Sequence, residues 1–133
     1  MFRYIPVVRP VEHRHSVTNE FGLYSFGEWN TNGFLSVTNP YNTMFKKHVI
    51  KLLDLNIVIL VEIHCLRDEV LEIEGYKVIQ FNRQNISKNA IRGSGGIAIL
   101  ISSKILNTHK IQGIYKGNDG QLGVKLTENE SGF

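Results

Sequence analysis

The sequence predicts an α/β domain, and three observations lead to that expectation. Residues 40–55 carry apolar side chains at helical spacing, and the apolar run Ile57–Val61 follows directly. A second apolar run, Ile97–Ser102, comes later in the chain. Apolar runs without alternation are typical of strands covered on both faces. A helix that leads into such a strand indicates a layered α/β architecture.

The composition fits one small domain. The 133 residues leave room for a single unit, and a hydrophobic content of 42% allows a core. The net charge of +3 is compatible with a polyanionic partner but does not indicate one. A single cysteine, Cys65, excludes an internal disulfide and fits a reducing compartment, so we expect an intracellular protein. The apolar runs are too short to span a bilayer, and we expect no membrane contact.

The first elements differ sharply in pattern. Residues 1–22 mix prolines with charged side chains and show no sustained period, so we expect an irregular leader there. The segment 23–29 then reads as a strand that ends at Asn30. Asn39 followed by Pro40 is a strong helix start, because asparagine caps the first turn and proline fits its first position.

The helix that follows is expected to run to about Leu55. Its predicted core face consists of the apolar residues that recur at helical spacing, which are Phe45, Val49, Leu52 and Leu53. The lysines between them are expected on the solvated side.

Three further segments complete the predicted order. Lys77–Phe81 reads as a strand, and the glycine-rich residues 93–96 lead into the strand Ile97–Ser102. These glycines lack the Lys-Ser/Thr pair of a phosphate-binding loop and precede a strand rather than a helix, so a structural turn is expected. Asp119-Gly120, between strand-like runs at 110–115 and 121–126, predicts a hairpin.

Polar side chains at two strand ends are the strongest candidates for function. Asn30 closes one predicted strand and Glu62 closes another. The carboxyl ends of parallel strands form the edge where α/β domains bind ligands. A carboxylate and an amide at this edge suit Mg²⁺ and a phosphate. The alternatives are that Glu62 points into solvent or pairs with Arg67, and that Asn30 and Asn32 only form a turn.

Four sequence blocks then suggest a family. They are Trp29–Gly33, Asn56–His64, Gly75-Tyr76 and Gly95–Lys104. In order and approximate spacing, they resemble the endonuclease/exonuclease/phosphatase superfamily, and more closely the endonuclease domain of non-LTR retrotransposons. The likeness extends from about residue 23 to residue 133, and Ile63 stands where the family usually has threonine.

The resemblance implies a DNase I-like fold, a four-layer α/β/β/α sandwich in which this chain forms the N-terminal half, with one mixed sheet and a covering helix. It implies that Asn30 is an active-site asparagine and Glu62 a metal ligand for Mg²⁺ or Mn²⁺, with Asn30 as a second ligand, both at a catalytic centre that hydrolyses phosphodiester bonds. DNA would be the partner through its phosphate backbone, and the nucleus the expected compartment. Asn32, His64 and Arg92 are the candidates for contacts with the nucleic acid.

The later family blocks, which supply a tyrosine, an Asp-x-Asn and a Ser-Asp-His motif, do not occur in this sequence. We therefore expect residues 23–133 to be a partial domain, truncated at its C-terminal end and inactive alone. The sheet face that would meet the second half is expected to be exposed, and self-association through it is possible. The alternatives are a non-catalytic interaction module that pairs with another chain or itself, and a relic of another phosphoesterase of the superfamily.

Overall fold

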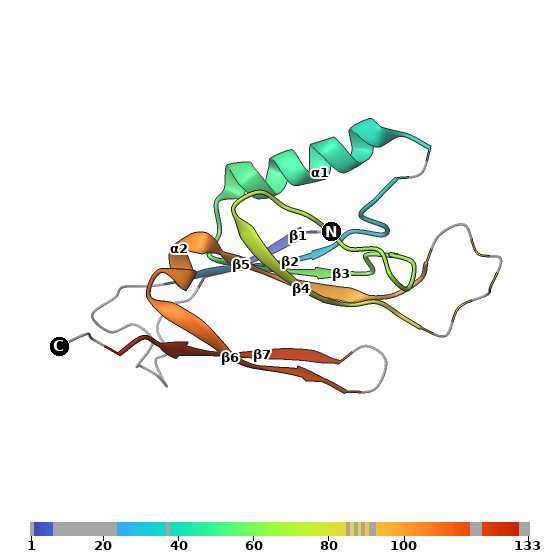
Figure 1. The fold of residues 1–133 in the computed structure, drawn as a ribbon. Helices are drawn as coiled ribbons and strands as arrows, with labels where there is room; N and C mark the ends of the chain where they lie inside the picture. Colours follow the sequence, from blue (N-terminus) through green and yellow to red (C-terminus); the bar gives the residue numbers. More distant parts are fainter. Residues whose placement is uncertain are drawn as a thin grey trace.

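The computed structural model describes residues 2–6, 24–36, 38–84, 86, 88, 90, 93–117 and 121–130. They form three layers: a helix, a central sheet and a two-stranded sheet (Figure 1). The elements are β1 (Phe2–Pro6), β2 (Ser25–Asn30), α1 (Pro40–Leu53), β3 (Ile57–Val61), β4 (Tyr76–Phe81), β5 (Ile97–Ser102), α2 (Ser103–Leu106), β6 (His109–Lys116) and β7 (Leu122–Glu128). Neither helix is long and apolar enough to cross a membrane within this part of the chain.

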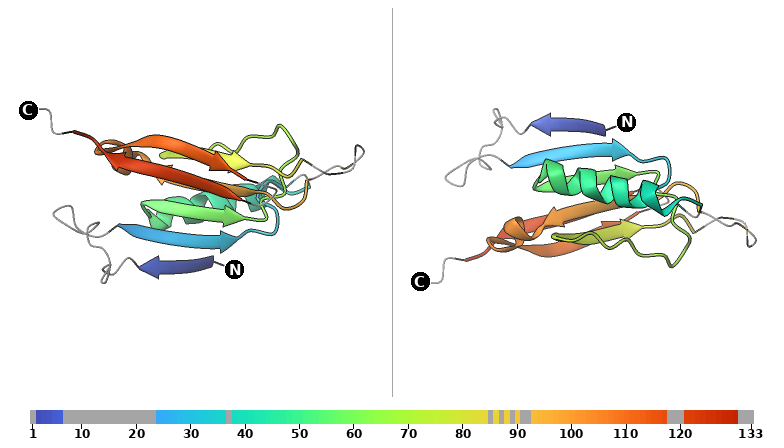
Figure 2. Two further views of the ribbon diagram at one scale, coloured as in Figure 1. Left: turned by 90° about the horizontal axis from the view of Figure 1, so that it is seen from below. Right: turned by 90° about the horizontal axis from the view of Figure 1, so that it is seen from above.

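The central sheet is mixed and has the strand order β1-β2-β3-β5-β4. Only β2 and β3 run parallel, and the other neighbours are antiparallel (Figure 2). The α/β class and the mixed sheet with a covering helix are confirmed, and β3 and β5 occupy the residues that their apolar runs predicted. The finer assignment to a four-layer sandwich remains a prediction.

The expectation of an irregular leader over residues 1–22 was wrong for Phe2–Pro6. These residues form β1, which pairs antiparallel with β2 from Phe2 opposite Trp29 to Pro6 opposite Ser25. A five-residue edge strand that ends at proline gives little sequence signal, because an edge position tolerates proline. Residues 7–22 lie outside the described part of the chain.

Helix α1 begins as the sequence predicted. The Asn39 side chain accepts a hydrogen bond from the Tyr41 backbone N–H at 3.0 Å, and Pro40 is the first helical residue. The helix ends at Asp54, which adopts a left-handed conformation with φ of 49° and donates its N–H to the Ile50 carbonyl oxygen. The capping signals therefore fixed the start, and the predicted end near Leu55 was close.

The predicted core face of α1 was wrong. Ile50 is buried, whereas Phe45 is 63% exposed and Leu52 is 69% exposed. The reason is that Thr43 and Lys46 tie the helix to the preceding loop. The Thr43 hydroxyl accepts from the Ser36 N–H at 2.8 Å, and Lys46 Nζ donates to the Gly33 carbonyl oxygen at 2.5 Å. The side of α1 that carries Thr43, Lys46 and Ile50 therefore faces the loop and the sheet, and Phe45 lies on the exposed side.

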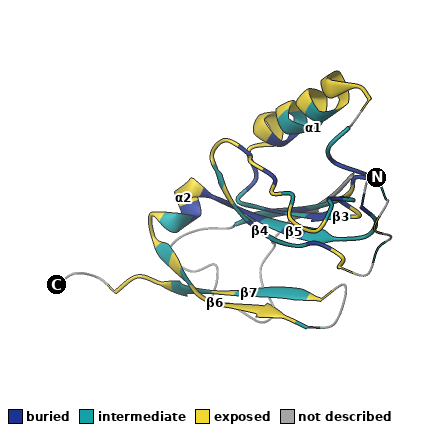
Figure 3. Cartoon of the chain, turned by 45° about the vertical axis from the view of Figure 1, so that its right-hand side comes forward, coloured by how far each residue is buried: buried dark blue, intermediate teal, exposed yellow. Residues whose placement is uncertain are grey.

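The central sheet buries apolar side chains on both faces, as the unalternating runs predicted. Val58 of β3, opposite Leu100 of β5, belongs to the core on the α1 side together with Ile50 and Phe34. On the other face, the buried core consists of Ile79, Ile101 and Ile105, and the partly buried residues packed against it include Ile111, Leu122, Val124 and Leu126. The hairpin β6–β7 therefore forms the third layer, beneath β4 and β5 (Figure 3).

This hairpin corrects the expectation of an exposed sheet face. Ile101 is 1% exposed and Ile79 is 5% exposed because the hairpin covers them. The outer face of the hairpin is itself exposed and carries Tyr115 (63% exposed), whereas Ile114 pairs with Val124 on the face toward the sheet and is 51% exposed.

Candidate functional site at the strand ends

The parallel pairing of β2 and β3 brings the two predicted site residues together. Asn30 lies opposite Val61 in the register, so Glu62 is the first residue beyond β3 at the same end. The Asn30 amide Nδ2 donates a hydrogen bond to Glu62 Oε2 at 3.0 Å. The sequence argument from strand ends thus located two side chains that are in contact.

Three residues at this end of the sheet adopt left-handed backbone conformations. Asn32 has a φ of 47°, Glu62 of 52° and His64 of 56°. Left-handed conformation costs an L-residue about 1 kcal/mol, and such residues cluster at functional sites. The remaining positive-φ residue other than glycine in the described chain, Asp54, is accounted for as the C-cap of α1.

The glycine-rich loop before β5 holds the left-handed segment in place. The His64 N–H donates to the Gly95 carbonyl oxygen at 2.9 Å, and the Gly93 N–H donates to the His64 carbonyl oxygen at 3.1 Å. A Cβ at Gly93 would lie 2.0 Å from the Cys65 carbonyl oxygen, so no other residue fits without a backbone shift. These contacts give the glycines the structural role that the sequence predicted.

The turn from Asn30 to Gly33 is held by its own backbone and by β3. The Asn32 N–H donates to Asn30 Oδ1 at 3.1 Å, which is an Asx turn. The Gly33 N–H donates to the Glu62 carbonyl oxygen at 2.7 Å. Thr31, 5% exposed, has its hydroxyl 3.0 Å from that same carbonyl oxygen. Asn32 itself is exposed at the edge of the site.

His64 lies beside the carboxylate rather than in solvent. Its Nε2 atom is 3.7 Å from Glu62 Oε1, and its side chain is 11% exposed. Gly33 packs against its ring, since a Cβ there would lie 3.3 Å from Nδ1. Contact of His64 with a nucleic acid therefore remains a prediction, and Arg92 lies outside the described residues.

Arg67, the alternative partner of Glu62, is engaged elsewhere. Its Nε donates to the Gln84 carbonyl oxygen at 3.1 Å, and its Nη2 donates to the Ile86 carbonyl oxygen at 2.6 Å. The Glu62 side chain is half exposed, with Asn30 and His64 beside it. Glu62 therefore sits at an accessible site with its own polar neighbours.

The donor set fits a weakly held divalent cation. Within the described ranges, no three or more His, Cys, Asp or Glu side chains gather as a metal cluster. Mg²⁺, however, commonly binds through one or two carboxylates with several waters. Glu62 can supply the carboxylate. Asn30 was predicted as a second ligand, but its amide NH₂ bonds Glu62 and its oxygen accepts the Asn32 N–H, so its observed contacts orient the carboxylate and the turn.

Two residues that hold the turn of the site in place were not predicted from the sequence. Lys46 reaches from α1 to the Gly33 carbonyl oxygen, and burial lowers the pKa of its ammonium group. Thr31 anchors the turn through its buried hydroxyl. The position of Thr31 inside the Trp29–Gly33 block was a usable signal, whereas nothing in the helix pattern marked Lys46.

Cys65, next to the site, is 1% exposed, and its environment disfavours the thiolate form that a nucleophile needs. Burial raises the pKa of its thiol to about 11, with the nearby Glu69 carboxylate acting in the same direction. A protonated, buried thiol at neutral pH favours a structural role for Cys65.

Comparison with protein-family models and with curated proteins finds no match to this sequence.

Proposed function

We propose that the strand-end site binds Mg²⁺ or Mn²⁺ through Glu62 and serves a metal-dependent phosphodiesterase, an endonuclease of the retrotransposon type that nicks DNA. The observation that carries the proposal is the 3.0 Å hydrogen bond from Asn30 to the Glu62 carboxylate at the end of two parallel strands. The left-handed backbone at Glu62 adds support, because strain of this kind is retained where geometry serves a site.

Each side chain has a separate part in this proposal. Glu62 would hold the cation, and Asn30 would keep the carboxylate oriented toward it. The bound cation would neutralise negative charge on a phosphodiester. Asn32, exposed on the adjoining turn, offers an amide NH₂ to a phosphate oxygen.

The proposal also predicts that the strand-end site lacks a general base. General-base catalysis needs a proton acceptor within reach of the attacking water. Of the three aspartates, Asp54 is bound to Lys104 at 2.7 Å at the opposite end of β3, Asp68 lies in an exposed turn, and Asp119 lies outside the described residues. His64, packed beside Glu62, is 11% exposed. We therefore propose that the 133 residues carry the metal-binding half of the site.

Cation binding is the direct test. Titration of the chain with Mn²⁺, followed by electron paramagnetic resonance, should show one weak site that competes with Mg²⁺. Glu62→Gln should weaken it by about tenfold or more, since replacing the ligand removes its charge. Glu128→Gln, at the exposed end of β7, is the matched control and should change nothing. Equal binding by both variants would refute the assignment.

A supercoiled-plasmid assay with Mg²⁺ tests the second part. We expect no nicking above background from these 133 residues. Nicking that disappears in Glu62→Gln would establish the activity and show that the half-site interpretation is wrong.

A further inference from the structure

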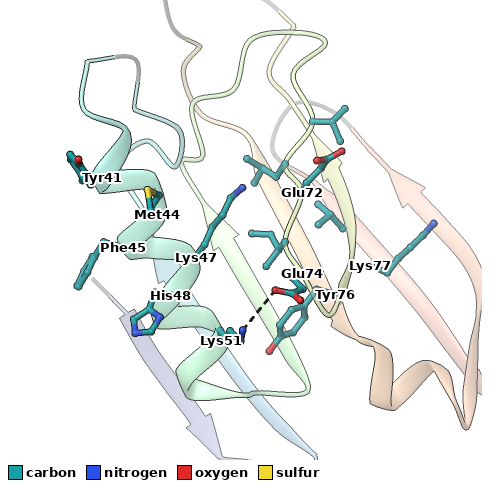
Figure 4. Close-up of a pocket in the computed structure, with 14 residues that line it drawn as sticks. Tyr41, Met44, Phe45, Lys47, His48, Lys51, Glu72, Glu74, Tyr76 and Lys77 are labelled. Carbon is teal, nitrogen blue, oxygen red and sulfur yellow. Dashed lines mark ion pairs between the residues drawn. The ribbon is translucent and has the colours of Figure 1, made fainter.

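A groove runs between α1 and the segment that leads into β4. It has a volume of about 1050 Å³ and lies on the α1 side of the sheet (Figure 4), and Glu62 is not among the residues that line it. One wall is the helix from Tyr41 to Lys51, and the other is the segment 70–74 with the first residues of β4.

The helix wall of the groove carries exposed apolar side chains. Tyr41 is 73% exposed, Met44 60% and Phe45 63%, and these residues share one side because they are three and four positions apart. On the facing wall, Val70 is 69% exposed. A helix with apolar residues on both its sheet side and its outer side is typical of a buried helix, whereas α1 is covered on the sheet side only. Contiguous exposed apolar surface of this kind marks an interaction site.

The two walls carry opposite charge. Helix α1 lines the groove with Lys47, His48 and Lys51 and with no acidic residue. The facing segment 70–74 lines it with Glu72 and Glu74 and with no basic residue, and Lys77 at the start of β4 adds one positive charge on that side. Lys51 Nζ and Glu74 Oε1 are 3.8 Å apart across the groove, with both side chains exposed. Lys47 also lines the groove and extends from the helix toward the acidic wall (Figure 4).

From this arrangement we propose that the groove is the docking surface for a second copy of the chain, with α1 of each copy seated against the acidic wall of the other. A twofold axis repeats every contact, so the interface must be complementary to itself. Opposite charge on the two walls meets this condition, because the basic helix of one copy faces the acidic segment of its partner. The apolar residues of the two helices are then buried together.

The outer surface of the β6–β7 hairpin fits a second copy less well. Tyr115 is exposed there, but the charged residues on the same face include Lys110 and Lys125. A twofold axis through this surface would bring like charges together, which disfavours association.

Charge exchange between the walls gives a sharp test. We expect the unaltered chain, analysed by sedimentation equilibrium at low salt and micromolar concentration, to show twice its monomer mass of 15.1 kDa. Lys47→Glu with Lys51→Glu should place acid against acid, and Glu72→Lys with Glu74→Lys should place base against base. Each double variant should raise the dimer dissociation constant by about tenfold or more. All four positions are exposed or half-buried charges, so the fold should tolerate the changes.

An equimolar mixture of the two double variants supplies the decisive result. Each chain of the mixed dimer then faces an opposite charge on both sides, so the mixture should recover the dimer that neither variant forms alone. Lys110→Glu with Lys125→Glu, on the hairpin, is the matched control and should leave association unchanged. A monomeric unaltered chain, a mixture that stays monomeric, or loss of the dimer in the hairpin variant would each overturn the proposal.

Discussion

The two ends of the β2–β3 pair differ in backbone strain. At the amino end, the Asn56 side-chain oxygen accepts from the Ser25 N–H at 2.8 Å, and the Asn56 carbonyl oxygen accepts from the Ser102 N–H at 2.8 Å. At the carboxyl end, Glu62 and His64 are held in left-handed conformations. One end joins three strands by favourable contacts, whereas the other retains strain.

This difference separates stability from the candidate function. A strained carboxylate persists only when its surroundings fix it, and the loop of Gly93 and Gly95 supplies that support by hydrogen bonds to His64. At the amino end, the hydrogen bonds of Asn56 to Ser25 and Ser102 link strands of the same sheet and so contribute to stability. The comparison therefore predicts that changes at the amino end lower stability alone, and that Glu62 can be changed with loss of cation binding but little loss of stability.

The largest effect is expected at Gly93, which supports the strained end. Gly93→Ala places a Cβ against the Cys65 carbonyl oxygen, so the backbone must shift, and we expect the free energy of unfolding to fall by about 3 kcal/mol or more. Urea unfolding followed by circular dichroism measures it. Gly113→Ala is the control, because nothing lies within 4 Å of a Cβ there. Equal stability of the two variants would break the account of the loop as a support.

Asn56→Ala should lower the free energy of unfolding by less than Gly93→Ala does, and it should act only at the amino end of the β2–β3 pair. It leaves the Ser25 N–H without its side-chain acceptor, and a buried or half-buried donor without a partner costs about 1–3 kcal/mol. The same urea experiment gives the loss. The Mn²⁺ affinity, corrected for the folded fraction, should be unchanged; a parallel loss of affinity would show that the two ends are coupled.

Glu62→Gly should leave the free energy of unfolding unchanged or raise it by up to about 1 kcal/mol, because glycine adopts a left-handed conformation without strain. Cation binding should be lost at the same time. A clear loss of stability would mean that the Asn30 hydrogen bond to Glu62 outweighs the strain, and the contrast between the two ends would fail.

The smallest effect concerns pH and Cys65. The folded chain holds the thiol pKa at about 11, above its ordinary value of 9.0, so the unfolded chain loses this proton first as pH rises. Folding therefore retains a proton between these values, and the free energy of unfolding should fall as pH rises from about 9 to about 11, with no change at neutral pH. Tyr24 and Tyr76 also have raised pKa values, so the difference between the unaltered chain and Cys65→Ala isolates the thiol. An identical pH dependence of both proteins would contradict the prediction.

Sequence reasoning succeeded where the signal was local or followed a topological rule. The apolar run Ile57–Val61 correctly predicted where β3 begins and ends. The rule that parallel strands end at the same edge correctly predicted that Asn30 and Glu62, 32 residues apart, lie close together. The start of α1 followed from Asn39 and Pro40 because a cap involves only neighbouring residues.

Sequence reasoning failed where distant hydrogen bonds decide the outcome. The exposed side of α1 depends on Lys46 reaching Gly33, which no periodicity contains. The left-handed conformation of His64 depends on Gly93 and Gly95, about thirty residues later in the chain. The hairpin β6–β7 was predicted as an element, but its place over Ile101 is a matter of tertiary packing.

The location of a bound cation tests the central claim most directly. In a two-dimensional ¹H–¹⁵N NMR spectrum of the chain, substoichiometric Mn²⁺ broadens amide signals close to the ion. We predict selective broadening at the strained end, at the amides of residues 30–33 and 61–64, with the signals of residues 54–56 at the other end unaffected. Broadening centred on the acidic residues 69–74, or spread evenly over the chain, would contradict the assignment of the strand-end site.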